Sequence, residues 1–564
     1  MFWMVLGFVY GKCSDHTELR RPYFGDLHVH THYSMDAAIQ GTVTTHQQAY
    51  DFAKGMPLEL PNIESELQLS KPLDFVSITD HSEMLGEIEI CRDSDRPGHW
   101  SLSCILFRNV DDFAYLFFNS GLARRPKSYK DGITRLPFCG LKSQNCNAVA
   151  REVWEEQRAL SEYNYEECSF TTFPGYEWTS SPHLSNLHRN VIFKNGHVPS
   201  LPISYYDAST PERLWRRLEE ECSGDCSSLT IPHNSNISGG KMFIAYDSQS
   251  HSELERYALS RAEHEPLIEI FQHKGSSECF PNGVDEQCDF EYTPFDNLIE
   301  DRYNGKFTDP PTEKDSVRWA LKEGLRYEDV ELANPYQYGI IASTDTHLGA
   351  AGAAQEQVFL GHGGAGKIGK EGLVDSPYFN PGGLAVVYAE ENSRASIFEG
   401  MRRKETYGTS GPRIELRFFA SEEPLSAECG TDAWIEEGYQ KGVAMGGGLT
   451  GSQMRYHINV KADPLSAPIS TIELYKGWIE EGETREAIYS VWKEEGGNEQ
   501  VCLSWLDENH NEQHSSFVYV RVLEIPSVRW SKQACLEQDC PEEIPDVVQE
   551  RAWSSPIFHK SGED

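Results

Sequence analysis

Short apolar runs that end in a polar cluster recur along this chain, and they limit its possible folds more than any other feature. They are residues 23–30, 73–81, 171–178, 189–193, 228–234, 266–273, 338–347 and 383–390. Continuous apolar runs bounded by turn signals are typical of strands buried on both faces. Helical segments lie between several of them, one ending at Gly55, one starting at Pro211 and one closing at Gly408. Alternating strands and helices predict a parallel sheet, and seven or eight such units predict a closed α/β barrel.

Most of the polar clusters contain histidine, aspartate or glutamate, and a barrel would bring them together. The carboxyl ends of barrel strands share one face, where enzymes of this architecture build their sites. In "HVH" (28–30) and "DTH" (345–347), alternate positions of one strand place both side chains on the same face, so that one ion can bind both. Histidine and carboxylate are common ligands of transition metals. The strand ends therefore predict a metal centre, with candidate residues His28, His30, Asp36, Asp80, His81, Glu177, His233, His273, Asp345 and His347.

The rest of the chain predicts an insertion, a second module and two terminal extensions. Residues 84–150 interrupt the pattern and form either a cover for the site or a structural excursion. Residues 414–535 contain short β-like runs with turn signals, which predict an antiparallel β-rich module, and residues 536–564 predict a loosely packed acidic tail. Residues 1–22 begin with an apolar stretch that suits either the remnant of an export signal or an ordinary strand.

Composition limits the partners and the compartment. The formal net charge of −38 argues against nucleic-acid binding, so a small anionic substrate would need a local positive centre such as bound metal ions. The N-terminal apolar stretch is too short to span a bilayer and no other segment resembles a membrane span, so no integral membrane contact is expected; the oligomeric state is left open. The fourteen cysteines lack the C-x-x-C spacing of structural zinc sites; they are local disulfides in an oxidising compartment or scattered free thiols. The first alternative predicts a periplasmic or secreted bacterial protein, with the close pairs Cys139/Cys146, Cys222/Cys226, Cys279/Cys288 and Cys535/Cys540.

Four motifs resemble those of the PHP superfamily, which is named for polymerase and histidinol phosphatase. They are "DLHVHTHYSMDA", "DFVSITDHSE", "PHN" and "STDTH", and the likeness covers about residues 23–410. It implies a distorted (β/α)7-type barrel over residues 23–413 with two or three divalent transition metal ions (zinc, manganese or iron). "TDHSEMLG", "LHRNVIF", "SSECF…DEQCDFE" and "TSGPRIEL" resemble more closely a long bacterial branch of that superfamily, known as a domain of unknown function. That branch implies no particular substrate.

Transferred residue by residue, the resemblance implies three metal positions. The first would be held by His28, His30, Glu177 and Asp345, and Glu177 would bridge to a second held also by His233 and His273. The third would be held by Asp36, His81 and His347, although many relatives have histidine at the position of Asp36. Asp80 is expected to orient an imidazole and Asp26 to support the site, whereas His32 remains unassigned between a substrate contact and a solvated side chain.

The activity that the resemblance implies is hydrolysis of small phosphoesters, either monoesters or diesters, by a hydroxide that bridges the metals. His188, Arg189 and Lys274 are candidates to neutralise the phosphoryl oxygens or the leaving group, and structural roles are equally open for them. His188 and Arg189 open the fourth strand and would lie at the wrong end of a parallel sheet. Glu83 is a candidate general acid or substrate contact, or a supporting residue. The alternatives are amidohydrolase-like cleavage of a C–N or C–O bond and a metal-stabilised binding protein without catalysis.

Overall fold

The computed structural model describes residues 12–61, 66–108, 135–182, 185–246, 250–293, 311–359, 361–363, 377–537 and 540–561. Each of the eight runs predicted as strands contains one, and every residue of these strands is buried except the first two of β1. Such burial on both faces is what continuous apolar runs predict. The strands are β1 (Arg21–Asp26), β2 (Phe75–Ile78), β3 (Thr171–Trp178), β4 (Arg189–Phe193), β5 (Ser228–Pro232), β6 (Leu267–Gln272), β8 (Gly339–Ala342) and β9 (Leu384–Ala389).

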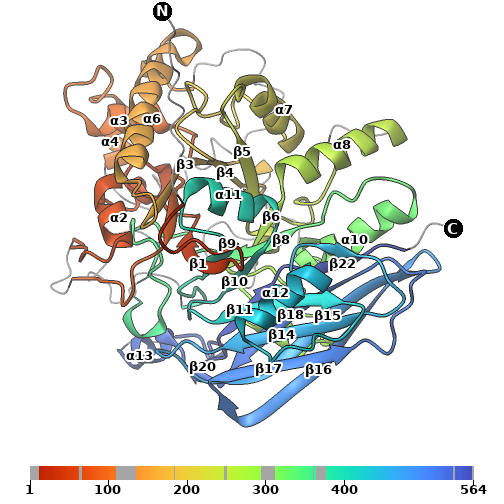
Figure 1. Cartoon of the computed structure of the whole chain (residues 1–564). Helices are drawn as coiled ribbons and strands as arrows, with labels where there is room; N and C mark the ends of the chain where they lie inside the picture. The colour runs from red at the N-terminus through yellow and green to blue at the C-terminus, as the bar shows by residue number, and fades with distance from the viewer. Residues whose placement is uncertain are drawn as a thin grey trace, which may run out of the picture.

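Helices lie around these strands, with α3, α4 and α6 grouped on one side and α7, α8 and α10 on the other (Figure 1). The α-helices are α1 (Met35–Ile39), α2 (His46–Ala53), α3 (Leu85–Arg92), α4 (Leu102–Arg108), α6 (Gln144–Asn164), α7 (Pro211–Glu221), α8 (His251–His264), α10 (Val317–Asp329) and α11 (Arg394–Arg402). Short 3₁₀ turns are η2 (Pro137–Cys139), η3 (Leu141–Ser143), η5 (Ser235–Ile237), η6 (Glu286–Asp289), η7 (Glu313–Asp315) and η8 (Glu356–Val358). The insertion predicted over residues 84–150 supplies α3, α4 and the start of α6, and its residues 109–134 lie outside the described part.

Two of the three glycine and proline boundary predictions are confirmed. Helix α2 ends just before Gly55, whose φ of +91° suits only glycine, and α7 starts at Pro211. The prediction for Gly408 is wrong, because this residue lies in strand β10 (Thr406–Thr409) after α11 has ended. Glycine at this position allows β10 to lie close to β8, since a Cβ there would be 2.7 Å from the backbone nitrogen of Ala342 in β8.

The sheet is mixed, and the prediction that its strands all run parallel is wrong. Strand β2 pairs in parallel with β1 and β3, but β4 is antiparallel to both β3 and β5, and β9 is antiparallel to β1. A parallel crossover needs about a dozen residues or more, and the connection 179–188 between β3 and β4 is too short for one. As a consequence, β4 starts at the same edge of the sheet at which β3 ends.

The strand pairing in the described residues does not close a barrel. Strand β6 pairs with β8 in parallel and with the short β7 (Gly275–Ser276), which makes a separate three-stranded sheet. A single bridge between Val29 and Thr346 joins the extensions of β1 and β8. The described fold is therefore mixed α/β with one large sheet and a small three-stranded sheet. The carboxyl ends of β1, β2, β3 and β5 from the large sheet and of β6 and β8 from the small sheet lie near one another.

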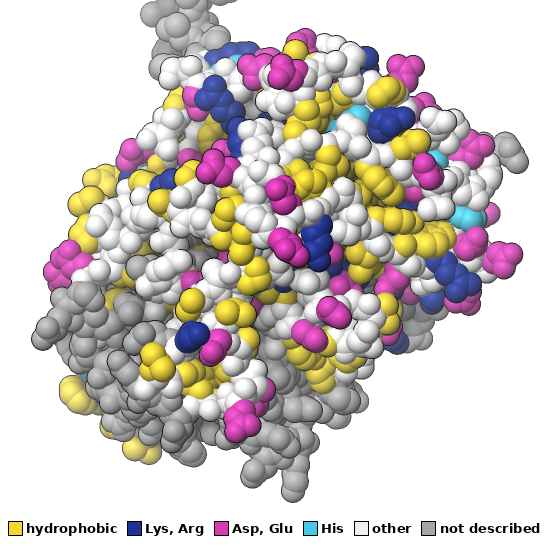
Figure 2. Space-filling view, turned by 90° about the horizontal axis from the view of Figure 1, so that it is seen from below, with side chains coloured by type: hydrophobic (Ala, Val, Ile, Leu, Met, Phe, Trp, Pro, Cys, Tyr) yellow, Lys and Arg dark blue, Asp and Glu magenta, His cyan; other side chains and the backbone are white. Residues whose placement is uncertain are grey.

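The C-terminal region is rich in β-strands. A four-stranded antiparallel sheet contains β11 (Glu415–Ser421), β12 (Gly442–Ala444), β14 (Arg455–Lys461) and β17 (Gln500–Leu506), with α12 (Asp432–Lys441) beside it. A second group, β15 (Ile469–Glu480), β16 (Glu483–Asn498) and β18 (Ser516–Glu524), belongs to the large sheet. The smaller elements are β13 (Gly448–Leu449), β19 (Ser527–Val528), α13 (Trp530–Glu537) and β20 (Val547–Val548). Seen from this end, the surface mixes hydrophobic side chains with charges of both signs (Figure 2).

The segment predicted as a loosely packed acidic tail instead contributes two buried strands. They are β21 (Arg551–Ser554) and β22 (Ile557–His559), and β21 joins β18 to β10. Their apolar side chains, such as Trp553 and Ile557, are buried because each strand has a neighbour on both sides in the 13-stranded sheet. The sheet is thus continuous from the C-terminal region into the strands that precede the site.

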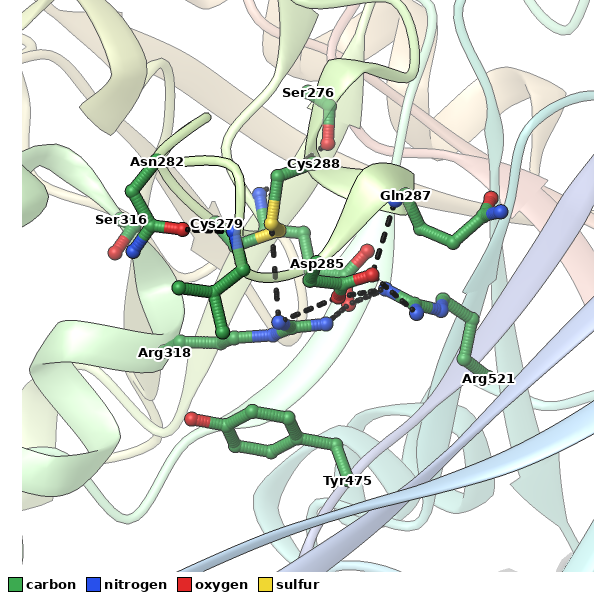
Figure 3. Close-up of a disulfide and its surroundings, with 12 residues drawn as sticks. Ser276, Cys279, Asn282, Asp285, Gln287, Cys288, Ser316, Arg318, Tyr475 and Arg521 are labelled. Carbon is green, nitrogen blue, oxygen red and sulfur yellow. Dashed lines mark hydrogen bonds and ion pairs between the residues drawn. A yellow bond between two sulfur atoms is a disulfide. The ribbon is translucent and has the colours of Figure 1, made fainter. Parts of the chain in front are cut away.

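A buried cluster of charges links the C-terminal region to the segment that follows β6 (Figure 3). Arg318 of α10 and Arg521 of β18 both contact Asp285, at 2.8 and 3.0 Å, beside the disulfide Cys279–Cys288. Both arginines also contact Glu278, at 2.6 and 2.9 Å. These ion pairs hold residues 278–288 against the β-rich region.

All fourteen cysteines pair in seven disulfides, so the reading as scattered free thiols is wrong. The four close pairs are those that the spacing predicts, and the other three are Cys13–Cys168, Cys91–Cys104 and Cys429–Cys502. Full pairing indicates an oxidising, extracytoplasmic compartment. Within the described ranges, the helices are too short or too polar to span a membrane.

Candidate metal centre

All nine side chains predicted as metal ligands lie together at the carboxyl ends of the strands. His28 and His30 follow β1, His81 follows β2, Glu177 lies in β3, and the remaining members follow β5, β6 and β8 or, for Asp36, start α1. Eight of the nine residues are buried, and the side chain of Asp36 is 13% exposed. Buried ionisable groups at such density require compensation for their charge.

The first predicted ligand group converges on a single point. The Nε2 atoms of His28 and His30 each lie 3.1–3.4 Å from Oε2 of Glu177 and from Oδ1 of Asp345. Ligands bound tetrahedrally at about 2.0–2.1 Å from zinc are about 3.3–3.4 Å from one another. The four nitrogen–oxygen distances are therefore close to those between ligands of one tetrahedral ion.

The third predicted group also lies close together, at hydrogen-bond distances. Oδ2 of Asp36 lies 2.9 Å from Nε2 of His81 and 2.8 Å from Nε2 of His347. The hydroxyl of Ser34 lies 2.8 Å from Nδ1 of His30 and 3.0 Å from Oδ1 of Asp36. Ser34 thereby fixes one residue of the first group and one of the third, an arrangement that suits neighbouring metal positions.

The second predicted group is divided between two carboxylates. Nε2 of His233 lies 3.4 Å from Oε1 of Glu177, whereas Nε2 of His273 lies 3.4 Å from Oδ2 of Asp345. Neither ring nitrogen of His233 has a hydrogen bond within the described residues, although the side chain is 2% exposed. A buried imidazole without hydrogen bonds is costly, and binding of a metal ion would remove that cost.

The electrostatics of the carboxylates match this arrangement. Burial alone would raise the pKa of Glu177, but the imidazoles of His81, His233 and His188 hold it well below its usual range. The pKa of Asp345 is likewise held low against burial by nearby imidazole and ammonium groups. Asp345 also adopts a φ of +54°, which is uncommon outside glycine and typical of functional positions.

Glu269 of β6 belongs to the site and was missed by the sequence analysis. Its Oε2 lies 3.0 Å from Nδ1 of His28, and the residue is 1% exposed. A carboxylate on the second ring nitrogen orients a metal-binding histidine and increases its basicity. The available signal was a carboxylate inside the apolar run "PLIEIFQH", four residues before His273.

Asp80 and Asp26 hold the loops that carry the candidate ligands. Asp80 accepts hydrogen bonds from the backbone and hydroxyl of Thr31 at 2.6 and 2.7 Å, and it orients the imidazole of His46 at 2.5 Å. Asp26 accepts a hydrogen bond of 2.6 Å from the hydroxyl of Thr344, so it joins the first loop to the last. Both carboxylates have the supporting roles that the sequence analysis expected.

His188 lies at the cluster, contrary to the expectation that it starts at the wrong end of its strand. Because β4 runs antiparallel to β3, His188 comes next to Glu177, and its Nδ1 lies 2.6 Å from Oε1 of that residue. Burial lowers the pKa of His188 to about 4, so the imidazole is neutral at pH 7. Lys274 also lies at the cluster, with its ammonium paired to Oδ2 of Asp345.

The other three candidates are occupied elsewhere. Arg189 is fully buried and pairs with Glu265 at 2.8 Å. Glu83 accepts hydrogen bonds from the backbone of Tyr205 and Thr179, and burial raises its pKa to about 7. His32, left unassigned from the sequence, is buried with Nδ1 3.0 Å from the carbonyl of Thr44, so it is not a solvated side chain. These contacts favour structural roles for Arg189 and Glu83.

Comparison with known proteins gives a family but no activity. No curated protein matches this chain. A crystal structure from Bacteroides vulgatus, of a two-domain protein containing a predicted PHP-like metal-dependent phosphoesterase, is 10% identical over 92% of this chain and 96% of that chain. Its TM-score of 0.32 is too low to support an argument from fold. A family model described as "Protein of unknown function (DUF3604)" matches residues 17–496 and 490–561, and the chain therefore belongs to the DUF3604 family.

Proposed function

We propose that this protein is a metal-dependent hydrolase of small phosphoesters that holds two or three divalent ions of zinc, manganese or iron. The observation that carries the proposal is the first ligand group, in which each of two imidazole nitrogens lies 3.1–3.4 Å from each of two carboxylate oxygens. Such mixed nitrogen and oxygen sets suit these ions. The ions would supply polarisation of a phosphoryl oxygen and a water that is nucleophilic near neutral pH.

The residues of the chain add binding and orientation. The Lys274 side chain is 26% exposed and its ammonium pairs with Asp345 at the edge of the cluster, which makes it the candidate cation for a substrate oxygen. A cation at that point favours an anionic substrate in a chain with a net charge of −38. Glu269 and Ser34 hold the imidazoles of His28 and His30 in fixed orientations, which reduces the reorganisation needed on reaction.

Location and partners follow from the same features. Seven disulfides support a periplasmic or secreted location, where a phosphoesterase would act on small esters outside the cytoplasm. The strong negative charge disfavours nucleic acid as a substrate. We propose a small phosphomonoester or phosphodiester as the substrate.

Metal analysis combined with a substrate panel tests the proposal. The full-length protein is purified after growth with zinc, manganese and iron, its metal content is measured by mass spectrometry, and 4-nitrophenyl phosphate, bis(4-nitrophenyl) phosphate, an anilide and a lactone are offered. We expect two or three ions per chain and hydrolysis of a phosphoester that stops on chelation and returns on metal addition. His28→Ala should abolish activity, whereas His32→Ala, in the same loop but turned toward Thr44, should retain most of it.

Each other outcome has a meaning. Absence of bound transition metal under these conditions would contradict the proposed function. Bound metal with cleavage of the anilide or lactone, and of neither phosphate, would favour the amidohydrolase-like alternative. Bound metal without hydrolysis of any substrate would favour a binding protein that is stabilised by metal.

A further inference from the structure

Arg529 joins the C-terminal region to the segment that precedes β9. It lies between β19 and α13, is 1% exposed, and pairs with both oxygens of Glu291 at 2.6 and 2.7 Å. The same guanidinium donates to two backbone carbonyls, that of Pro377 at 3.0 Å and that of Phe379 at 2.6 Å. Because a guanidinium carries its N–H groups in a fixed fork, these contacts set the position of residues 377–379 relative to Arg529.

Trp530, the first residue of α13, holds the same segment and a second one. Its indole nitrogen donates a hydrogen bond of 2.9 Å to the carbonyl of Phe379, which also accepts one from Arg529. The backbone nitrogen of Trp530 donates to the side chain of Glu356 in η8, and its ring centroid lies 4.8 Å from that of Phe359. Residues 529 and 530 thus contact both segment 377–379 and segment 356–359.

The first of these segments reaches His273, a candidate metal ligand. The backbone nitrogen and the side-chain amide of Asn380 both donate to the carbonyl of His273, at 3.1 and 3.2 Å. The ring of Phe379 packs edge-on against the imidazole of His273, with the ring centroids 5.1 Å apart. Residues 379 and 380 therefore hold the backbone and the ring of His273, and Arg529 and Trp530 hold residue 379.

The second segment reaches His347, another candidate ligand. The ring centroid of Phe359 lies 4.9 Å from that of His362. The carbonyl of His362 accepts a hydrogen bond of 2.9 Å from the backbone nitrogen of His347, and Nε2 of His362 lies 2.9 Å from the carbonyl of Pro381. His362 thus links His347 to both segments.

We infer that Arg529 and Trp530 are positioning residues for the metal centre, which act through Phe359 and Phe379 on His347 and His273. This inference rests on the proposed function, because it treats both histidines as metal ligands. Ligands carried on loops need such support, since their donor atoms must be held in place by the contacts behind them. The C-terminal region then takes part in the site and does more than pack against it.

Zinc release and the spectrum of bound cobalt test this role without reference to activity. The full-length wild type, Arg529→Met, Trp530→Phe and the control Arg521→Met are loaded with Zn²⁺ or Co²⁺ and titrated with a colorimetric chelator. Contacts behind a metal ligand typically contribute about 10–100-fold to metal affinity, so Arg529→Met should release its most weakly held zinc at about 10-fold lower chelator concentration than the wild type. Trp530→Phe loses one N–H donor and should shift less, in the same direction.

The control separates positioning from general stability. Arg521 is a buried arginine of the same region that pairs with Glu278 and Asp285, so Arg521→Met should keep the zinc release of the wild type although it is less stable. The visible absorption of bound Co²⁺ reports ligand geometry, and it should change in Arg529→Met and stay unchanged in Arg521→Met. Equal shifts in the two variants would contradict the inference, because lost stability alone would explain them.

The remaining outcomes are equally decisive. If Arg529→Met is folded by circular dichroism and has the zinc release and cobalt spectrum of the wild type, the inference is wrong. If it does not fold, Trp530→Phe decides, since it keeps an aromatic ring beside Phe359, and an unchanged release curve overturns the inference. A wild type that binds no zinc, cobalt, manganese or iron would contradict the proposed function, and the inference with it.

Discussion

Two buried clusters of charged side chains compensate their carboxylates in different ways. In the cluster between α10 and β18, the guanidinium groups of Arg318 and Arg521 lie against Asp285 (Figure 3). Both also contact Glu278, and the four distances are 2.6–3.0 Å. Burial alone would raise the pKa of Glu278, but Arg521 and Arg318 hold it far below its usual range. This cluster is complete with the side chains of the protein.

In the candidate metal centre the carboxylates face imidazoles and, among contacts of the described residues, one permanent cation. That cation is Lys274, which contacts Asp345, whereas Glu177 is surrounded by histidines at 2.6–3.4 Å. Several of these separations are long for hydrogen bonds but suit donors that share an ion. This difference indicates that the cluster between α10 and β18 serves structure, whereas the candidate metal centre needs a further component.

The largest expected effect is on the rate of hydrolysis, and it should follow a change in the candidate metal centre but not a change in the arginine cluster. His28→Ala removes a nitrogen from the first ligand group, and we expect hydrolysis of a phosphoester to fall about 10⁴-fold or more, equal to about 5.4 kcal/mol of transition-state stabilisation. Initial rates at saturating zinc measure it, and Arg521→Met should retain most of the activity. Equal losses in the two variants would remove the functional distinction between the clusters.

Arg521→Met tests the structural cluster. It leaves Glu278, Asp285 and Glu473 short of a partner, because Arg521 contacts all three at 2.6–3.0 Å. Breaking one side of a buried ion pair typically costs about 3–5 kcal/mol, so the free energy of unfolding in urea should fall by that amount. Zinc content should stay at the wild-type value; a drop would show that the interface cluster also supports the metal centre.

Glu524 sharpens the comparison, because this buried carboxylate pairs with no arginine among the contacts of the described residues and lies outside the candidate metal centre. Glu524 accepts a hydrogen bond of 2.6 Å from Ser466, its Oε1 has no hydrogen bond in the described part of the chain, and burial raises its pKa to about 7. A bound proton thus neutralises the charge of Glu524, as the guanidinium groups compensate the charge of Glu278. The folded state binds this proton more tightly than the unfolded state, so the contribution of Glu524 to stability is complete below about pH 4.5 and is lost as the pH rises through about 7.

Glu524→Gln should flatten this part of the pH profile. Relative to the wild type, we expect the variant to gain on the order of 3 kcal/mol in unfolding free energy between about pH 4.5 and pH 8. Urea unfolding at a series of pH values measures the slope. The exposed Glu508→Gln is the control, and a profile of Glu524→Gln parallel to that control would show that Glu524 titrates normally.

Residues at strand ends could be predicted from the sequence because their setting is local. His28, His233 and Asp345 each follow an apolar run, and the run by itself indicates a buried strand with its polar end at the edge. The direction of β4 could not be predicted in this way, because a buried run reads the same in a parallel and an antiparallel sheet. The position of His188 depends on that direction, so it was misjudged.

Composition misled the prediction for the C-terminal segment. The acidic and polar residues before Arg551 suggest a tail, yet the short apolar groups around Trp553 and Ile557 are enough to form central strands when neighbours on both sides are available. Those neighbours are β10 and β18 for β21, and β13 and β18 for β22, and all of them come earlier in the sequence. Burial that depends on distant partners cannot be read from a short window.

The smallest predicted effect concerns Glu269, whose role also depends on a distant partner. Glu269→Gln keeps the shape of the side chain but removes the charge that faces Nδ1 of His28 at 3.0 Å. An outer carboxylate typically contributes about 10–100-fold to metal affinity, so zinc release should shift by that factor while the zinc count at saturation stays unchanged. Chelator titration measures the shift. Glu265, which pairs with Arg189, provides a buried control: Glu265→Gln should alter stability and leave zinc release unchanged. A carboxylate that only filled space in β6 would behave like this control, whereas one that orients a ligand changes metal affinity before it changes folding.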